Sequence, residues 1–354
     1  MRAQYELEYE RNLTSALAAE LEAEFEAAGG MRGFAGARRH SLADYEIIGN
    51  DDRVRVTNTL EIPFRFICCL EVLSGTSNEI RSRGTGTLIS NRHVLTAAHN
   101  VDHNVPTSAF PINYVRPNHI FVAPARNDRN FPGHFSAVQT VRVSPVWQHH
   151  AARRIEPPNH SDWALLTLRT PLGTRQPNAP VTMQLPAPPL AWWSHRQFGG
   201  QTRIRAFDAA HWQRLRHESL NICGYAGDKC RHRPVKGSST ETDTCARVAV
   251  PGNFRSIAPP GIVPFVDWAS TQWRSYGRIV NPLEASGLIT YSIDTVGGHS
   301  GGPVWINWEG YRNLVGIHTL GRVTPTTNAC VRITEPLLRQ LRAWMRRDGV
   351  QPTF

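Results

Sequence analysis

From residue 47 onward, the chain alternates short runs of β-branched and aromatic residues with turn-forming residues, and this pattern limits the possible fold more than any other feature. The clearest runs are RFICCLEVL, GTGTLIS, HIFVAPA, DWALLTL and NLVGIHTL. Many short strands separated by turns are typical of a β-sandwich or a β-barrel. We therefore expect an all-β architecture over most of the chain.

One helix is expected near the end of the chain, in the segment TEPLLRQLRAWMRR. Its apolar residues recur at helical spacing, Thr334 is a suitable N-cap, and Pro336 suits the first turn. Residues 171–222 and 230–285 are polar, contain proline and show little periodicity. We interpret these two stretches as long connections or insertions.

The first 46 residues differ in composition from the rest. Residues 1–30 carry seven Glu and two Arg, whereas the whole chain has a formal net charge of +10. The stretch ALAAELEAEFEAA consists of strong helix formers, and GGMRGFAGARRH has the composition of a flexible linker. We interpret residues 1–46 as a pro-segment or targeting segment, with a disordered tail as the alternative, and residues 47–354 as the folded domain.

The basic charge of the main body is compatible with a nucleic-acid or anionic partner. No zinc finger, RNA-binding sheet signature or helix-turn-helix pattern accompanies the charge, so we interpret it as a solvated surface and expect no nucleic-acid partner. No apolar run is long enough to span a membrane. The start of the chain lacks the basic head and apolar core of a standard secretory signal.

Six cysteines permit disulfide bonds and favour an oxidising, extracellular destination, while a cytoplasmic location stays open. Cys230 and Cys245 flank a polar loop and could pair. No CxxC or HExxH pattern is present, so we expect no metal site and no cofactor. We also expect the protein to act as a monomer.

A serine within a glycine cluster, in DTVGGHSGGPVW, is the first candidate for chemistry. Glycine permits positive φ and close backbone approach, so Ser300 would lie on a tight loop that suits either a structural turn or a nucleophile. His99 follows an apolar strand in TAAH, and Asp162 precedes another in SDWALL. These residues supply a base and a carboxylate that could orient it. The order His, Asp, Ser is that of the double β-barrel proteases.

Together these blocks resemble the signatures of the trypsin/chymotrypsin-like serine peptidases. TAAH, SDWALL and GGHSGGPV carry this resemblance, while NDDRVRVTNT, ICGYAGDK and LVGIHT are similar to segments of the bacterial glutamyl endopeptidases within that group. The resemblance covers roughly residues 47–345 and implies two packed antiparallel six-stranded β-barrels with a C-terminal helix. The first barrel would span about 47–175, with His99 and Asp162, and the second about 200–345, with Ser300.

The resemblance also implies a role for each residue. His99 would act as the general base, Asp162 would orient it, and Ser300 would form an acyl-enzyme. The backbone N–H groups of Gly298 and Ser300 would form the oxyanion hole, and loss of one such donor typically slows an enzyme by about 10²–10³. We therefore expect a serine endopeptidase that acts on polypeptide substrates.

By the same resemblance, Thr295 and His318 would occupy positions that contact the substrate carboxylate in glutamyl endopeptidases. A hydroxyl and an imidazole can both donate hydrogen bonds to a carboxylate, and a protonated imidazole adds charge. A pocket for Arg or Lys would need an acid where Thr295 stands. We therefore expect cleavage after Glu, and less so after Asp, with a purely structural His318 as the alternative.

The residue before the serine differs from that of trypsin-like zymogens. In those proteins the freed N-terminus pairs with an Asp at this position, whereas His299 stands here, so that ion pair is unavailable. In the glutamyl group the new N-terminus instead lies near the bound acidic side chain. The segment DYEIIGNDDR offers the Glu46–Ile47 bond, which a Glu-specific enzyme could cut in itself, and we predict processing there.

Two alternatives differ in what the same residues do. The triad could serve a pocket that prefers small or aromatic residues. The chain could instead be a catalytically silent module that binds an acidic or glycan partner through its basic surface. The presence of all three triad residues argues against the second alternative.

Overall fold

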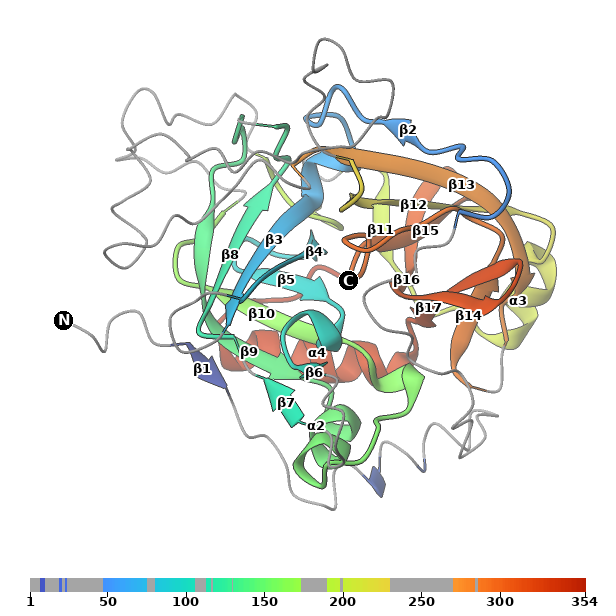
Figure 1. Ribbon diagram of the computed structural model, residues 1–354. Helices are drawn as coiled ribbons and strands as arrows, with labels where there is room; N and C mark the ends of the chain where they lie inside the picture. The colour runs from blue at the N-terminus through green and yellow to red at the C-terminus, as the bar shows by residue number, and fades with distance from the viewer. Residues whose placement is uncertain are drawn as a thin grey trace, which may run out of the picture.

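Strands from the two halves of the chain gather into two β-barrels that lie side by side (Figure 1). In this computed structural model the described residues are 7–9, 19–20, 23, 47–74, 80–105, 113–115, 117–128, 130–172, 190–197, 200–229, 270–283 and 286–354. In Figure 1 the strands of the first barrel run in colour from blue through cyan to green, and those of the second run from yellow through orange to red.

The first barrel is a closed ring of six antiparallel strands, because the path β9-β10-β5-β4-β3-β8 returns to β9 through the β8–β9 pairing. Two further residues of β1 (Glu8–Tyr9) pair with β9 in parallel. The six strands are β3 (Ile67–Ser74), β4 (Ile80–Leu88), β5 (His93–Thr96), β8 (His119–Pro124), β9 (Ser136–Val143) and β10 (Ala164–Leu168). The short strands β6 (His103–Val105) and β7 (Asn113–Val115) form a separate pair.

The second barrel closes in the same way, along β16-β15-β12-β13-β14-β17 and back to β16. Outside this ring, β2 (Val54–Arg55) pairs with β13, and β11 (Thr202–Ile204) pairs with β16 in parallel. The six strands are β12 (Ser219–Tyr225), β13 (Gln272–Asn281), β14 (Leu288–Tyr291), β15 (Pro303–Trp308), β16 (Tyr311–Thr324) and β17 (Thr327–Arg332). The expected fold of two antiparallel six-stranded barrels is thereby confirmed.

Strand β3 shows why the first barrel packs against the second. Successive side chains of a strand point to opposite faces, and every residue of β3 is buried. Cys68, Leu70 and Val72 belong to the core inside the first barrel. Ile67, Cys69 and Leu73 belong to a second core, which also contains side chains of β12, β15 and β16. A strand that is buried on both faces therefore joins the two barrels.

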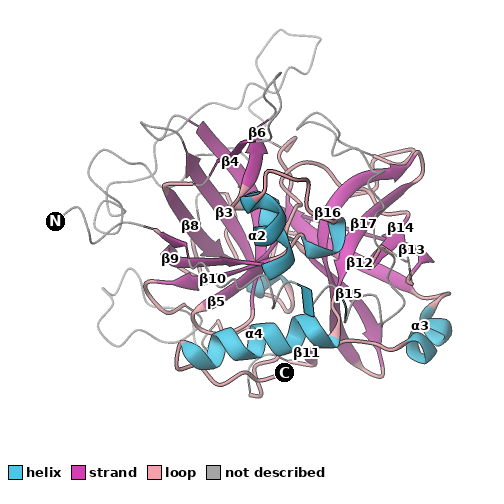
Figure 2. Ribbon diagram, turned by 90° about the horizontal axis from the view of Figure 1, so that it is seen from below, coloured by secondary structure: helices cyan, strands magenta, loops and turns pink. Residues whose placement is uncertain are grey.

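The expected C-terminal helix is α4 (Glu335–Arg347), which lies along one side of the molecule across both barrels (Figure 2). Thr334 is its N-cap, and its hydroxyl accepts a hydrogen bond from the backbone N–H of Leu337. The buried face consists of Leu337, Leu338, Leu341, Trp344 and Met345. The predicted apolar stripe is thus the surface that packs on the barrels.

Two further helices lie in segments where the sequence pattern predicted none. Helix α2 (Pro145–Ala152) starts with proline at its first position, and α3 (Ala209–Leu215) is capped by Asp208, which accepts from the N–H of His211. Both span two turns or so, which is too short for a periodic pattern to stand out. The described residues also include the 3₁₀ turns η2 (Phe64–Phe66), η3 (Ala98–Asn100) and η4 (Asn159–Ser161).

The interpretation of residues 171–222 and 230–285 as insertions is wrong in part. The first stretch contains β11, α3 and the start of β12, and the second contains all of β13. Strand β13 has exposed residues on one face, so it lacks the continuous apolar run that marks β3. Within residues 1–46, Glu8 and Tyr9 form β1, and Ala19, Glu20 and Ala23 are helical.

The lengths and compositions of the helices are relevant to the prediction that no segment spans a membrane. None of the helices in the described ranges is long and apolar enough to cross a bilayer.

Candidate active site

His99 and Asp162 meet at the edge of the first barrel, each on a short 3₁₀ turn beside a strand. His99 lies in η3, directly after β5, and Asp162 lies between η4 and β10, which pairs with β5. His99 donates twice to this carboxylate, from its backbone N–H to Oδ1 (2.9 Å) and from Nδ1 to Oδ2 (2.7 Å). Asp162 is 1% exposed, and the His99 side chain is 27% exposed. A buried carboxylate thus fixes the tautomer of a ring whose Nε2 is left for chemistry.

Ser300 lies on the turn between β14 and β15 in the second barrel, and groups of the first barrel hold that turn. The Ser300 carbonyl accepts hydrogen bonds from Asn100 Nδ2 and from the N–H of Thr85, both at 2.8 Å. Asn100 directly follows His99, so the serine loop is joined to the histidine turn. No hydrogen bond joins His99 to the Ser300 hydroxyl among these described residues, and in free enzymes this bond often tightens only when substrate binds.

The buried Thr85 fastens the same loop at a second point. Its hydroxyl donates to the carbonyl of Gly298 (2.6 Å) and accepts from the N–H of Tyr225 (2.9 Å). Gly298 has φ +95°, and a Cβ there would lie 2.2 Å from the Tyr225 carbonyl oxygen. Glycine is therefore required at this position for both its backbone angle and its lack of a side chain.

Some amides of the serine loop, among them those of Gly298 and Ser300, have no acceptor within the described residues. The N–H groups of His299, Gly301 and Gly302 donate to carbonyls of Val296, His318 and His299, respectively. Within the described part of the chain, the N–H groups of Gly298 and Ser300 donate to none. Buried backbone donors are nearly always paired, so two free donors on one turn are an available anion site of the oxyanion-hole type.

Thr295 and His318 flank the serine loop, and both are buried. The backbone of His318 exchanges hydrogen bonds with Gly301 and Gly302, which places β16 beside the loop that carries Ser300. The Thr295 hydroxyl makes no hydrogen bond with any residue that the structure describes. Thr295 lies five residues before Ser300 along the chain, so both residues are next to the serine loop.

His318 is a neutral imidazole in this structure. Its Nδ1 lies 2.6 Å from the hydroxyl of Tyr291 and 3.1 Å from the carbonyl of Ala329. Burial, together with the neighbouring His299 and His99, lowers the pKa of His318 to about 3. The expectation that a protonated ring adds charge to the pocket does not fit this environment, because desolvation disfavours the charged form.

His299 is buried and cannot anchor a charged N-terminus. Its ring lies 3.3 Å from the Trp273 carbonyl, and burial lowers its pKa to about 4. Asp294, five residues further back, accepts from the backbone N–H of Ile48 (2.6 Å) and of Asp52 (3.0 Å). Asp294 was not identified as a site residue from the sequence, where its only distinguishing feature is its position at the start of DTVGGHSGG.

The residues after the predicted processing site are firmly anchored beside the active-site loop. The buried Arg53 pairs with Asp51 (2.8 Å) and Asp228 (2.5 Å), and Asp228 lies in the turn that follows β12. This explains why NDDR and GYAGDK occur together, because they supply the two halves of one ion-pair cluster. Ile47 is the first residue of this described segment, and Glu46 lies outside the described residues.

The structure also bears on the suggested disulfide bonds and on the prediction of no metal site. Cys68, Cys69, Cys223 and Cys330 are buried free thiols, and burial raises the pKa of Cys68, Cys223 and Cys330. The suggested partners Cys230 and Cys245 lie outside the described residues. Over the described ranges, no group of His, Cys, Asp or Glu side chains is arranged to hold a metal ion.

Comparisons with known proteins indicate the family to which the chain belongs. The trypsin family model matches residues 69–258. No curated protein sequence matches the chain. A structure of a Glu endopeptidase in complex with MPD is 20% identical, covers 85% of this chain and 100% of its own, and has a TM-score of 0.53. At this identity the likeness shows the fold, two packed barrels of the chymotrypsin type.

Other solved structures resemble the chain more distantly. The HL collagenase is 13% identical, with a TM-score of 0.46, over 85% of this chain and 99% of its own. The protease Anisep from Arthrobacter nicotinovorans is also 13% identical, with a TM-score of 0.44, over 78% of this chain and 93% of its own. The family match spans more than half of the residues, and the chain therefore belongs to the trypsin family of serine proteases.

Proposed function

We propose that the protein is a serine endopeptidase with Ser300, His99 and Asp162 as its catalytic triad. The observation that carries this proposal is the pair of unengaged amides at Gly298 and Ser300, on a loop whose carbonyls are already held. A purely structural turn would use those donors internally, because unpaired backbone donors are costly. An oxyanion hole needs them free.

In the proposed reaction, the Ser300 hydroxyl oxygen attacks the carbonyl carbon of the scissile peptide, and His99 Nε2 accepts the hydroxyl proton. The amides of Gly298 and Ser300 donate to the negative oxygen of the tetrahedral intermediate. The C–N bond then breaks as His99 gives its proton to the departing amine, which leaves an ester on Ser300. His99 next takes a proton from water, whose oxygen attacks the ester carbonyl. The ester C–O bond then breaks as His99 returns the proton to the Ser300 oxygen, which releases the new carboxylic acid. Asp162 stabilises the imidazolium in both halves of the cycle.

We further propose that the enzyme prefers Glu, and less so Asp, before the scissile bond. Thr295 and His318 support this because both lie beside the serine loop, and each carries a group that can donate a hydrogen bond. Neutral donors suit a carboxylate in a buried pocket, since hydrogen bonds to an ionised group are stronger than neutral ones. The preference would arise from hydrogen bonds rather than from a charged histidine.

A second preference, for small or aromatic residues, is favoured by one observation. Burial favours the neutral form of His318, so this residue brings no full positive charge to the pocket, and an uncharged side chain would enter without losing an ion pair to it. This alternative keeps the same triad and differs only in the residue that fills the pocket.

Hydrolysis of matched peptides that differ only at the residue before the cut tests both proposals. We expect the highest kcat/KM with Glu, a lower value with Asp, and low values with Gln, Ala, Phe and Lys. The Ser300→Ala variant should lose at least about 10⁴-fold in kcat, since removal of a triad member leaves only residual catalysis. A Phe or Ala optimum would reject the Glu preference while leaving the triad intact.

A catalytically silent binding module is separated from an enzyme by covalent labelling. A fluorophosphonate reacts with an activated serine, so it should label the wild-type protein and not Ser300→Ala. Absence of labelling in a folded wild-type sample would contradict the triad. Because the probe does not depend on the pocket's preference, this result is independent of the peptide assay.

We also propose that the chain is a zymogen that is cut between Glu46 and Ile47 and acts outside the cell as a monomer. Trypsin-like proteases are often secreted. The hydrogen bond from Ile48 N–H to Asp294 supports the cut, because a new ammonium group at Ile47 would lie one residue from a buried carboxylate. Burial raises the pKa of Asp294, and a nearby positive charge would lower it again.

Intact mass measurement tests this processing. The purified wild-type chain should lose residues 1–46 during incubation, while Ser300→Ala and Glu46→Gln stay at full length. Addition of a trace of active enzyme should then cut Ser300→Ala and leave Glu46→Gln whole. A fully active wild-type chain that keeps its first residue would contradict the proposal.

A further inference from the structure

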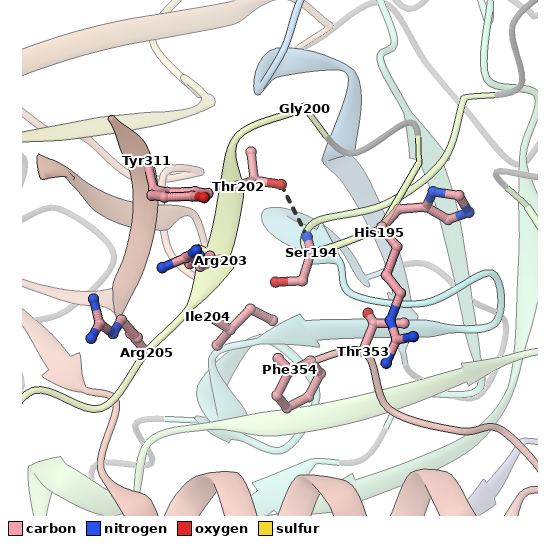
Figure 3. Close-up of a pocket in the computed structure, with 11 residues that line it drawn as sticks. Ser194, His195, Gly200, Thr202, Arg203, Ile204, Arg205, Tyr311, Thr353 and Phe354 are labelled. Atoms are coloured by element: carbon pink, nitrogen blue, oxygen red, sulfur yellow. Dashed lines mark hydrogen bonds between the residues drawn. The ribbon is translucent and has the colours of Figure 1, made fainter. Parts of the chain in front are cut away.

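A cavity of about 330 Å³ opens beside strand β11, at the edge of the second barrel (Figure 3). None of its residues belongs to the proposed triad, the serine loop or the specificity pocket. Its volume is within the range of small-molecule sites and is about ten times that of one water molecule. The lining residues are Ser194, His195, Arg196, Gly200, Thr202, Arg203, Ile204, Arg205, Tyr311, Thr353 and Phe354.

Ser194 brings an unused hydroxyl to this cavity. The residue is 8% exposed, and its backbone N–H donates to the Thr202 hydroxyl (3.0 Å). Among the residues that the structure describes, Ser194 Oγ has no hydrogen-bond partner. Figure 3 shows the hydroxyl turned toward Ile204, on the cavity side. A buried hydroxyl without a partner costs stability, so a ligand that accepts its hydrogen bond would remove that cost.

The backbone at Ser194 is also strained. Its φ is +68°, in the left-handed region that residues other than glycine seldom occupy. Such strain persists where the surrounding structure enforces it and is frequent at ligand sites. The hydrogen bond to Thr202 holds this conformation, and the conformation in turn aims the hydroxyl.

The charged residues of the lining are all basic. Arg196, Arg203 and Arg205 line the cavity, and no acidic side chain does. The guanidinium of Arg203 lies 3.3 Å from the ring centroid of Tyr311, and such stacking orients a planar guanidinium. Arg205 lies 3.5 Å from the exposed Glu309, a screened surface pair of small energy. Three guanidinium groups therefore line the cavity, and that of Arg205 is paired with Glu309.

We propose that this cavity binds a small organic anion whose phosphate or carboxylate is held by the arginines and the Ser194 hydroxyl. Guanidinium groups bind both oxyanions through paired hydrogen bonds. Ile204, Tyr311 and Phe354 form apolar walls, so the ligand should carry an apolar or aromatic portion beside its anionic group. The oxyanion could come from a free phosphate ester or from an acidic side chain of a bound polypeptide.

Calorimetric titration of the full chain with Ser300→Ala, which cannot cleave a probe, tests this proposal. The probes are phenyl phosphate, inorganic phosphate and N-acetylglutamate amide. We expect phenyl phosphate to bind one to one and more tightly than inorganic phosphate, because only the ester reaches the apolar walls. Binding of the blocked glutamate with the same dependence on cavity residues would identify a polypeptide side chain as the source.

Variants assign any binding to the cavity. Arg203→Gln should weaken binding about tenfold or more, the value of one hydrogen bond to a charged group. Ser194→Ala should weaken it several-fold while leaving the melting temperature of the ligand-free protein unchanged or higher. Arg214→Gln, which removes an equal charge from the exposed face of α3, should change neither quantity.

The proposal is overturned if no probe binds at millimolar concentration. It is also overturned if Arg214→Gln weakens binding as much as Arg203→Gln, because the effect would then be one of overall charge. A Ser194→Ala variant that melts lower and binds equally well would show that the hydroxyl serves the fold alone. None of these outcomes depends on the protease activity.

Discussion

At the scale of single residues, the hydroxyl of Tyr291 determines which ring nitrogen of His318 carries the hydrogen. Burial raises the pKa of Tyr291 well above its usual range, so the phenol keeps its proton. When this proton is donated to Nδ1 of His318, the imidazole hydrogen resides on Nε2, which can then donate to a substrate carboxylate. Without the phenol, Nδ1 would donate to the Ala329 carbonyl, and Nε2 would present a lone pair that repels a carboxylate.

Tyr291→Phe should therefore weaken the proposed preference for Glu. We expect kcat/KM for Glu peptides to fall about tenfold or more, mainly through KM, since one hydrogen bond to a charged group is lost. The value for the matched Gln peptide should change little, because an amide can hydrogen-bond to either tautomer. Tyr276→Phe, at a side chain that is 68% exposed, is the matched control. An equal loss for both peptides would contradict the tautomer argument.

The residues that could be predicted from the sequence are those that sit in local blocks. His99, Asp162 and Ser300 each lie in a short segment of recognisable pattern beside a strand. Tyr291 and Asp294 could not be assigned this way, because their roles depend on which strands and segments meet. The neutral state of His318 could not be predicted either, because burial sets its pKa and the sequence does not show burial.

At the scale of elements, strand β4 of the first barrel holds the loop of the second barrel that carries Ser300. Thr85 contributes its backbone N–H to the Ser300 carbonyl and its hydroxyl to the Gly298 carbonyl. These bonds turn the carbonyls of the serine loop toward β4 and leave the amides facing the other way. The shape of the proposed oxyanion hole would therefore depend on a strand in the other barrel.

Thr85→Val preserves the shape of the side chain and removes its hydrogen bonds. We expect kcat to fall about tenfold with little change in KM, because a displaced Gly298 amide stabilises the transition state less. Thr87→Val is the matched control, since Thr87 is also buried on β4 and points to the same face. Peptide hydrolysis and fluorophosphonate labelling rates check this. A similar fall in both variants would show that β4 acts only through stability.

Elements were predictable where their burial pattern was simple. The apolar runs of β3 and β10 and the amphipathic stripe of α4 gave correct positions. Strand β13 has an exposed face with arginines, and β11 is only three residues long, so neither stands out from its surroundings. Their places are set by pairing with β12 and β16, which is a tertiary interaction.

At the scale of the whole molecule, α4 follows the last strand of the second barrel and is tied at its far end to the first. Asp348, just after the helix, accepts hydrogen bonds from His93, Arg142 and Thr167 on three first-barrel strands. Trp344 packs against Trp163 with ring centroids 5.5 Å apart. The helix therefore limits relative motion of the barrels, and the proposed triad has members from both.

Asp348→Asn should make the protein less stable in a pH-dependent way. Burial opposes ionisation of Asp348, but the three donors outweigh it and hold its pKa well below the usual range. An ordinary carboxyl group titrates near pH 4. A lowered folded-state pKa contributes stability above that pH, and this contribution is lost as the pH falls toward the folded-state value.

We expect Asp348→Asn to lose about 2 kcal/mol of unfolding free energy at pH 7, with partial exposure of the pair taken into account. The difference from wild type should shrink below about pH 4. Asp208→Asn is the control, because Asp208 also pairs with a histidine but is exposed. Denaturant unfolding at several pH values measures this. A pH-independent difference would contradict the assigned role of the charge.

The pairing of β1 with β9 changes what a cut at the Glu46–Ile47 bond would produce. Glu8 and Tyr9 lie in parallel register with Thr140 and Val141 of the first barrel. After cleavage, the N-terminal segment would therefore stay bound to the first barrel through this strand pairing. Cleavage would then yield a complex of two chains, with two bands on a denaturing gel and one mass in native mass spectrometry. Dissociation of the N-terminal segment would be a separate, slower step.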